Sequence, residues 1–244
     1  MPAPAGNGLG VSQVAGGWAV RIDTRVLRFN LMPGANESGG GLIRPSFISD
    51  DYRSHVIAAF NGGFQLKDSG GGFYLGGVTV QGLTGGAASL VIRTDGTATV
   101  GQWGRDLAMG PDVEGVLQNL HLIVDGGAPT DVSDGDTSRW GPTLGGTPYV
   151  PRAGVCVDGG GNLTWVGGPG LSSAGLARVM VAAGCTRGME LDINPQWVSF
   201  AIYDHHDPAN PTNVSGRNLY GSMYYGPDSY FSPRGRNWVM LTAR

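Results

Sequence analysis

Glu190, Asp192 and Asn194 alternate with apolar residues in the segment 189–195. Successive side chains of a strand point to opposite faces, so a strand here places these three polar groups on one face. Carboxylates are rarely buried without partners, and a face of this kind meets a cleft, a metal ion or an oppositely charged side chain. The alternation therefore makes this strand the first candidate for a functional site.

Arg152 stands at the entrance to an apolar segment, which is an uncommon place for a guanidinium without a partner. The planar guanidinium binds a carboxylate or a phosphate through two parallel hydrogen bonds. Arg152 is therefore either a phosphate contact or one half of a structural ion pair with Asp192 or Glu190.

Two other polar side chains stand directly before glycines at the ends of apolar runs. Asn61 precedes Gly62 and Gly63, and Asp125 precedes another glycine pair. Asn-Gly is also a common turn dipeptide, so an ordinary turn is the alternative at the first junction. Two such junctions in one chain favour a shared rim of loops around a site.

Metal and nucleotide sites find little support. Asp131, Asp134 and Asp136 resemble a calcium-binding loop only loosely, because the downstream glutamate of such a loop is missing. The glycine-rich segment 6–10 has no strand before it, so it is not a dinucleotide-binding loop. We expect no metal and no cofactor.

Segments rich in β-branched and aromatic residues recur between glycine clusters, as is typical of a strand-dominated fold. We expect residues 18–22 and 26–31 to form a first strand pair. Asp95-Gly96 predicts a hairpin turn between strands at 89–94 and 97–103. The three glycines at 159–161 predict a second hairpin, between strands at 153–157 and 162–166.

The clearest helix is predicted over residues 172–183, where apolar residues recur at three and four spacing. Ser172 or Ser173 can cap its first amides, and Gly184 can end it in the left-handed conformation. The chain then continues directly into the acidic strand at 189–193. A shorter helix is expected within 111–119, followed by a strand at 120–124.

Composition limits the class of protein. The chain has 244 residues, of which 44 are glycines without a collagen period, and this mixture fits a β-rich globular protein with many loops. Charged residues make up only 14%, the net charge is -3, and no run of Lys or Arg occurs, so we expect no nucleic-acid partner. No segment has the length of apolar sequence that a membrane span requires.

Cys156 and Cys185 could form one disulfide, but nothing in their spacing requires it, and we interpret them as two unpaired buried thiols. Residues 1–8 lack the charged and apolar regions of a signal peptide. The sequence therefore fits either a cytosolic protein or one whose export leader has been removed.

Several segments, in their order along the chain, resemble the phosphodiester glycosidase domain family. This family includes a lysosomal uncovering enzyme and bacterial exopolysaccharide-associated proteins. The resemblance extends from about residue 55 to the C-terminus. It rests on the following segments: Asn61-Gly62-Gly63-Phe64, the glycines at 72, 76 and 77, Leu122-Ile123-Val124-Asp125-Gly126, Arg152 at the start of a strand, the capped helix at Ser172, Leu191-Asp192, and residues 232–238 as a closing strand.

The resemblance implies hydrolysis of a sugar 1-phosphodiester at the anomeric carbon, which releases free sugar. It places Asn61, Arg152 and Asp192 in the active cleft. Adding the polar alternation gives Asp192, Glu190 and Arg152 as catalytic residues. The expected substrate-binding residues are Asn61, Gly62, Gly63, Asp125, Asn194 and Trp197.

The chain departs from the family where Ile193-Asn194-Pro195 follows Asp192, because a glycine run is usual at this point. We therefore place it in a divergent branch. The alternative is a non-catalytic glycan-binding or cell-surface module with the same fold. The resemblance also implies a phosphorylated glycan or sugar 1-phosphodiester as the partner, and a secreted or cell-surface location.

The expected fold class is α+β, with β-rich mixed sheets, a few short helices and long glycine-rich loops. Residues 1–16 are expected to be a flexible tail, and residues 17–244 a single domain.

Overall fold

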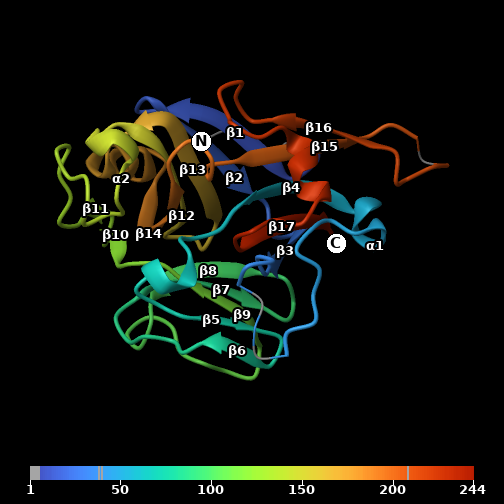
Figure 1. Cartoon of the computed structure of the whole chain (residues 1–244), viewed down its shortest axis with the longest axis horizontal. Coiled ribbons are helices and arrows are strands. Elements are labelled where there is room, and N and C mark those ends of the chain that lie inside the picture. Colours follow the sequence, from blue (N-terminus) through green and yellow to red (C-terminus); the bar gives the residue numbers. More distant parts are fainter. Residues whose placement is uncertain (1–5, 38, 40, 208) are drawn as a thin grey trace.

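The computed structural model describes residues 6–37, 39, 41–207 and 209–244. Three β-sheets form most of it, with few helices (Figure 1), which confirms the prediction of a β-rich fold. Every pairing between the strands described is antiparallel, where we expected mixed sheets. No helix among the described residues is long and apolar enough to cross a membrane.

The largest sheet has seven strands and carries α2 on one face (Figure 1). Its strands, in spatial order, are β1 (Leu9–Val14), β2 (Gly17–Ile22), β13 (Leu163–Leu171), β12 (Val150–Asp158), β14 (Cys185–Ile193), β10 (Leu122–Asp125) and β11 (Ala128–Pro129).

Two five-stranded sheets complete the fold. The second sheet has the order β16 (Val214–Asn218), β15 (Phe200–His205), β4 (Val56–Asn61), β17 (Trp238–Ala243) and β3 (Leu27–Met32). The third has the order β6 (Val78–Gln81), β5 (Phe73–Leu75), β9 (Val113–Gln118), β7 (Ala88–Arg93) and β8 (Ala98–Gln102).

The helical segments are short and lie between or beside the sheets. They are α1 (Asp50–Arg53), α2 (Ser173–Ala182) and the 3-10 turns η1 (Leu66–Asp68), η2 (Leu144–Gly146) and η3 (Pro227–Phe231).

One apolar core connects the three sheets. Leu191 of the first sheet, Phe60 and Phe200 of the second and Leu117 of the third belong to the same buried cluster. The ring of Trp165 on β13 meets the ring of Phe200 edge to face, with centroids 5.0 Å apart. Burial of large apolar side chains contributes about 1.5–3 kcal/mol each, so this cluster holds the sheets together and fixes the strand ends that meet at the site.

The α2 helix forms as its sequence predicts. Ser172 Oγ accepts a hydrogen bond from the Gly175 amide at 2.9 Å, which caps the first turn. Leu176 and Met180 are fully buried against the outer face of the seven-stranded sheet. Gly184 has φ +87° and ends the helix, and the chain enters β14 at the next residue. The acidic strand is thereby positioned by the helix before it.

Both predicted hairpins are confirmed. Strands β7 and β8 pair across Asp95-Gly96, and strands β12 and β13 pair across the glycine turn at 159–161. Residues 18–22 and 26–31 are also strands, but they do not pair with each other. β2 pairs with β1 and β13, whereas β3 joins the second sheet beside β17, because the short turn between β2 and β3 carries the chain from one sheet to the next.

Three other expectations are wrong. Residues 9–14 do not belong to a tail, because they form β1 and pair along all of β2. The segment expected to hold a helix within 111–119 is β9, the central strand of the third sheet, where pairing with two neighbours overrides the local pattern. Cys156 and Cys185 form a disulfide, with Cα atoms 5.7 Å apart, because β12 and β14 are neighbours in the sheet although distant in sequence.

Candidate active site

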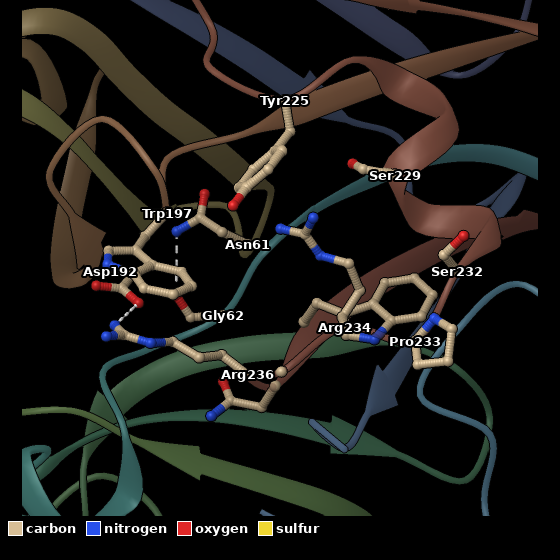
Figure 2. Close-up of a pocket in the computed structure, with 13 residues that line it drawn as sticks. Asn61, Gly62, Asp192, Trp197, Tyr225, Ser229, Ser232, Pro233, Arg234 and Arg236 are labelled. Atoms are coloured by element: carbon tan, nitrogen blue, oxygen red, sulfur yellow. Dashed lines mark hydrogen bonds and ion pairs between the residues drawn. The ribbon is translucent and has the colours of Figure 1, made fainter. Parts of the chain in front are cut away.

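Two cavities lie on either side of a group formed by Asp192, Arg236 and Trp197, which borders both. The first cavity has a volume of about 280 Å³ and is lined by Asn61, Gly62, Asp192, Trp197, Tyr225, Ser229, Ser232, Pro233, Arg234, Gly235, Arg236, Asn237 and Trp238 (Figure 2). The second has a volume of about 320 Å³ and is lined by Phe64, Gln65, Asp68, Pro142, Asp192, Ile193, Asn194, Trp197 and Arg236.

Backbone contacts fix Asp192 near the end of β14. Its amide donates a 2.8 Å hydrogen bond to the carbonyl of Gly62, and its Oδ1 accepts one from the Ile193 amide at 2.9 Å. Asn194 then adopts φ +74°, and its amide donates to the Pro151 carbonyl at 2.8 Å. This left-handed residue turns the chain away from the sheet and leaves the carboxylate at the strand end, between the two cavities.

Arg236 holds the Asp192 carboxylate. Its Nη1 donates to Asp192 Oδ2, and the centre of its guanidinium lies 3.7 Å from the centroid of the Trp197 ring (Figure 2). The side chains of Asp192 and Arg236 are 4% and 20% exposed. An aromatic face attracts a guanidinium, so Trp197 helps to fix the cation over the carboxylate.

Burial raises the pKa of Asp192 to about 7, although Arg236 and the Ile193 amide favour the ionised form. The nearby carboxyl of Glu37 adds to the rise. A carboxyl that titrates near neutral pH at a cavity wall is suited to acid-base or electrostatic catalysis.

Close packing of two loops builds the wall of the first cavity. A Cβ atom on Gly62 would lie 1.9 Å from Asn237 Oδ1, so only glycine allows the two backbones to approach this closely. Asn237 Oδ1 accepts a hydrogen bond from the Gly63 amide at 2.9 Å, and Asn237 Nδ2 donates to Glu37 Oε2 at 2.8 Å. The Asn61 side chain accepts from the Ser199 amide at 3.2 Å, which joins the end of β4 to the start of β15.

Arg152 and Glu190 form a sealed ion pair that borders neither cavity. Arg152 Nη1 lies 2.6 Å from Glu190 Oε1, and both side chains are 0% exposed. The same guanidinium donates to the carbonyls of Leu171 and Trp140, at 3.0 Å each. Burial raises the pKa of Glu190 to about 7, opposed by Arg152. The geometry matches the structural ion-pair interpretation and does not support the proposed catalytic roles of Arg152 and Glu190.

Strand alternation alone does not give Glu190 and Asp192 a common environment, because the pairing of β12 with β14 is irregular between them. Glu190 pairs with Gly154 and Ile193 pairs with Arg152, with a register shift between these pairs. The guanidinium of Arg152 reaches Glu190 and not Asp192. A bulge of this kind redirects side chains at the end of a strand, and its position is not visible in the sequence.

Some of the remaining predicted site residues line a cavity and others do not. Asn61, Gly62 and Trp197 line the first cavity with Asp192, and Asn194 lines the second. Gly63 borders neither cavity, although its amide supports Asn237. Asp125 also borders neither, because its carboxylate accepts a 2.7 Å hydrogen bond from Arg105 at another part of the sheet.

The residues that precede β17 also belong to the site, although they are not among the predicted site residues. Arg234 and Arg236 both line the first cavity, as does Ser229 of η3, and Asp68 of η1 lines the second. The signal was present in the sequence, since two arginines flank a glycine just before an apolar strand. The family resemblance gives that segment only as a closing strand. No cluster of three His, Cys, Asp or Glu side chains that could hold a metal ion occurs within the described part of the chain.

Two solved structures share the fold. The catalytic domain of zebrafish N-acetylglucosamine-1-phosphodiester alpha-N-acetylglucosaminidase, auto-inhibited by its pro-peptide, has a TM-score of 0.57 and 13% identity, over 97% of this chain and 82% of that one. A hypothetical protein from Synechocystis has a TM-score of 0.52 and 11% identity, over 97% of this chain and 61% of that one. At these identities the likeness shows the fold alone. No protein-family model matches the sequence, and no curated protein matches it.

Proposed function

We propose that this protein hydrolyses a sugar 1-phosphodiester at the anomeric carbon. The observation that carries the proposal is the buried Asp192 carboxyl, held by Arg236 between two cavities, in a chain that shares the fold of a phosphodiester glycosidase catalytic domain. A carboxylate next to an anomeric carbon and a cation next to a leaving phosphate are the two groups that such a reaction needs.

In the proposed reaction the bond between C1 and the phosphate ester oxygen breaks, and its electron pair stays on that oxygen. Water supplies the oxygen that forms the new bond to C1 and gives up one proton. The products are the free sugar and a phosphomonoester. The leaving phosphate is a stabilised anion and needs little protonation, so stabilisation of its charge matters more than a general acid.

Asp192 acts in its ionised form in this proposal. It stabilises the positive charge that develops at C1 or takes the proton of the attacking water. Arg236, which Trp197 fixes from its ring face, holds the carboxylate in place and also faces the leaving phosphate from the first cavity. The phosphate contact expected of Arg152 is thus made in this proposal by the arginines of the 234–236 segment.

The proposed location is outside the cytosol, on the cell surface or secreted. The disulfide between Cys156 and Cys185 supports this, because disulfides form and persist mainly in oxidising compartments.

The test is a panel of sugar 1-phosphodiesters that vary in the sugar and in the aglycone, with free reducing sugar and phosphomonoester measured together. The proposal predicts equal amounts of the two products from at least one member of the panel. Release of a nucleoside or alcohol with sugar 1-phosphate would show cleavage on the other side of phosphorus and would overturn it.

The second candidate function is binding without turnover. The observation that favours it is the ion pair of Asp192 with Arg236, which leaves the carboxyl only 4% exposed. A binding module would retain sugar 1-phosphodiesters at equilibrium and release no sugar at high protein concentration over long incubation.

A further inference from the structure

The charges around the two cavities differ although both cavities share Asp192 and Arg236. The first cavity adds Arg234, so two guanidinium groups and one carboxyl line it. The second adds Asp68, so one guanidinium and two carboxyl groups line it. The opposite charges of Asp192 and Arg236 cancel in both cavities. Arg234 therefore makes the first cavity cationic, and Asp68 makes the second anionic. Charged ligands follow such local differences, because the cavity walls screen charge less than bulk water does.

Arg234 has no acidic partner among the residues that the structure describes. Its guanidinium instead lies over two aromatic rings, 4.7 Å from the centroid of Tyr230 and 5.5 Å from that of Tyr225. Figure 2 shows it turned into the first cavity, with Asn61 on one side and Ser229 on the other. Arg152, by contrast, already contacts a carboxylate and two carbonyls. Of the two arginines that line the first cavity, Arg236 is paired with Asp192, so Arg234 is the one available to an external anion.

Two further donors at the first cavity lack partners. Ser229 Oγ and Arg236 Nε are both buried, and neither has a hydrogen-bond partner in the structure. Buried donors are normally satisfied, and an unsatisfied one costs free energy until a ligand or water fills it. All three donors belong to residues that line the first cavity, and N–H and O–H donors match the acceptor oxygens of a phosphate group.

The second cavity has the character of a sugar site. Asp68 and Gln65 offer a carboxyl and an amide group that can hydrogen-bond to hydroxyl groups, and Phe64 and Pro142 supply apolar surface. The Asn194 side chain, which also lines this cavity, is held by the Leu144 amide and the Pro142 carbonyl. The two carboxyl groups of the cavity disfavour an anion there. A neutral sugar, with hydroxyls and apolar ring faces, fits this lining better than a phosphate does.

We propose that the first cavity is a phosphate-binding subsite formed by Arg234, Arg236 and Ser229, and that the second cavity binds the sugar. This orientation of the substrate rests on the proposed function. It places the bond between C1 and the phosphate oxygen beside Asp192, where the two cavities meet. The aglycone then continues from the first cavity past Tyr225, which is 39% exposed, toward Tyr224, which is 62% exposed.

Binding of inorganic phosphate, measured by calorimetry, tests the subsite without any turnover. Arg234→Gln is expected to lower the affinity for phosphate about tenfold or more, because a charge-assisted hydrogen-bonding group is lost. Arg25→Gln, which removes an exposed arginine of the turn between β2 and β3, is the matched control and should change it less than about twofold. Equal affinity in wild type and Arg234→Gln would overturn the proposal.

Ser229→Ala separates a ligand role from a structural one. The hydroxyl has no partner in the protein, so its removal should leave the thermal midpoint of unfolding unchanged or higher. The same variant should lower the phosphate affinity several-fold. An unchanged phosphate affinity would mean that Ser229 does not bind phosphate.

Asp68→Asn tests the sugar cavity. It should weaken the inhibition of sugar release by a free monosaccharide such as N-acetylglucosamine, and it should leave phosphate affinity unchanged or raised. Arg234→Gln should instead lower phosphate affinity and leave the inhibition by the monosaccharide unchanged. Loss of phosphate binding in Asp68→Asn would overturn the assignment.

If wild type binds phosphate through Arg234 and Ser229 but hydrolyses no sugar 1-phosphodiester, the proposed function fails and the phosphate subsite stands. If turnover occurs and phosphate does not bind there, the subsite fails and the function stands.

Discussion

Arg236 donates a hydrogen bond to the carboxylate of Asp192 while the centre of its guanidinium lies 3.7 Å from the centroid of the Trp197 ring. The carboxylate comes from the end of β14 and the guanidinium from the loop before β17. The contact thus joins the first sheet to the second at the point where two cavities meet. It defines the candidate active site more closely than the acidic strand does alone.

Stability should fall as the pH rises from about 4 to about 7. Burial raises the pKa of Asp192 and of Glu190 to about 7, whereas unfolded carboxyl groups titrate near 4. Between these values the folded state binds more protons than the unfolded state, so the free energy of unfolding decreases with pH. Urea denaturation at a series of pH values measures this slope, and a stability that rises steadily from pH 4 to pH 7 would contradict the assignment.

Asp192→Asn should flatten the same slope, because asparagine does not titrate. Asp131→Asn is the matched control, since Asp131 is 81% exposed in its pair with Arg139. It should leave the slope close to that of the wild type.

The buried pair of Arg152 and Glu190 should behave as a structural unit. Arg152→Met alone leaves a buried carboxylate without its partner and should lower the free energy of unfolding by about 3–5 kcal/mol at pH 8. The double variant Arg152→Met with Glu190→Leu should recover most of this loss, because two apolar side chains can replace a buried pair at little cost.

A control pair and an activity measurement complete that experiment. Arg139→Met breaks the exposed pair with Asp131 and should cost less than about 1 kcal/mol. If the folded double variant loses turnover of a sugar 1-phosphodiester while Arg139→Met keeps it, Arg152 or Glu190 has a catalytic role and the structural interpretation is wrong.

Gly62 and Gly63 should respond differently to alanine. A Cβ on Gly62 would lie 1.9 Å from Asn237 Oδ1 and 2.5 Å from the Asn237 carbonyl oxygen, so the loop that carries Arg236 must move. A Cβ on Gly63 would lie 3.3 Å from Asn119, which a small shift relieves. Gly62→Ala should lower the thermal midpoint and phosphate affinity more than Gly63→Ala does. The opposite order would show that the two loops do not depend on this close approach.

Local patterns predicted the elements whose determinants are local. The Asp95-Gly96 turn, the Ser172 cap and Gly184 each act within a few residues, and the hairpin and helix they predict are present. The pairing partners of β2, the strand character of β9 and the disulfide depend on contacts between distant segments. No pattern within one segment carries that information.

In the candidate site, too, the sequence predicts residues that stand out locally and does not predict contacts between distant segments. Asn61, Asp192 and Trp197 stand out by residue type and position, and they meet at the cavities. The partners of Arg152 and Asp192 could not be predicted, because a regular strand alternation puts both carboxylates on one face and the sequence does not give the pairing register. The register shift between β12 and β14 gives Glu190 to Arg152, and the loop before β17 brings Arg236 to Asp192.

Single-turnover release of reducing sugar, by wild type and Asp192→Asn on the best substrate of the sugar 1-phosphodiester panel, tests the central claim most directly. Thermal melting of both proteins serves to establish that the variant is folded. The proposed role of Asp192 predicts a fall in rate of at least about 10²-fold in the folded variant. A rate within about twofold of wild type would contradict it.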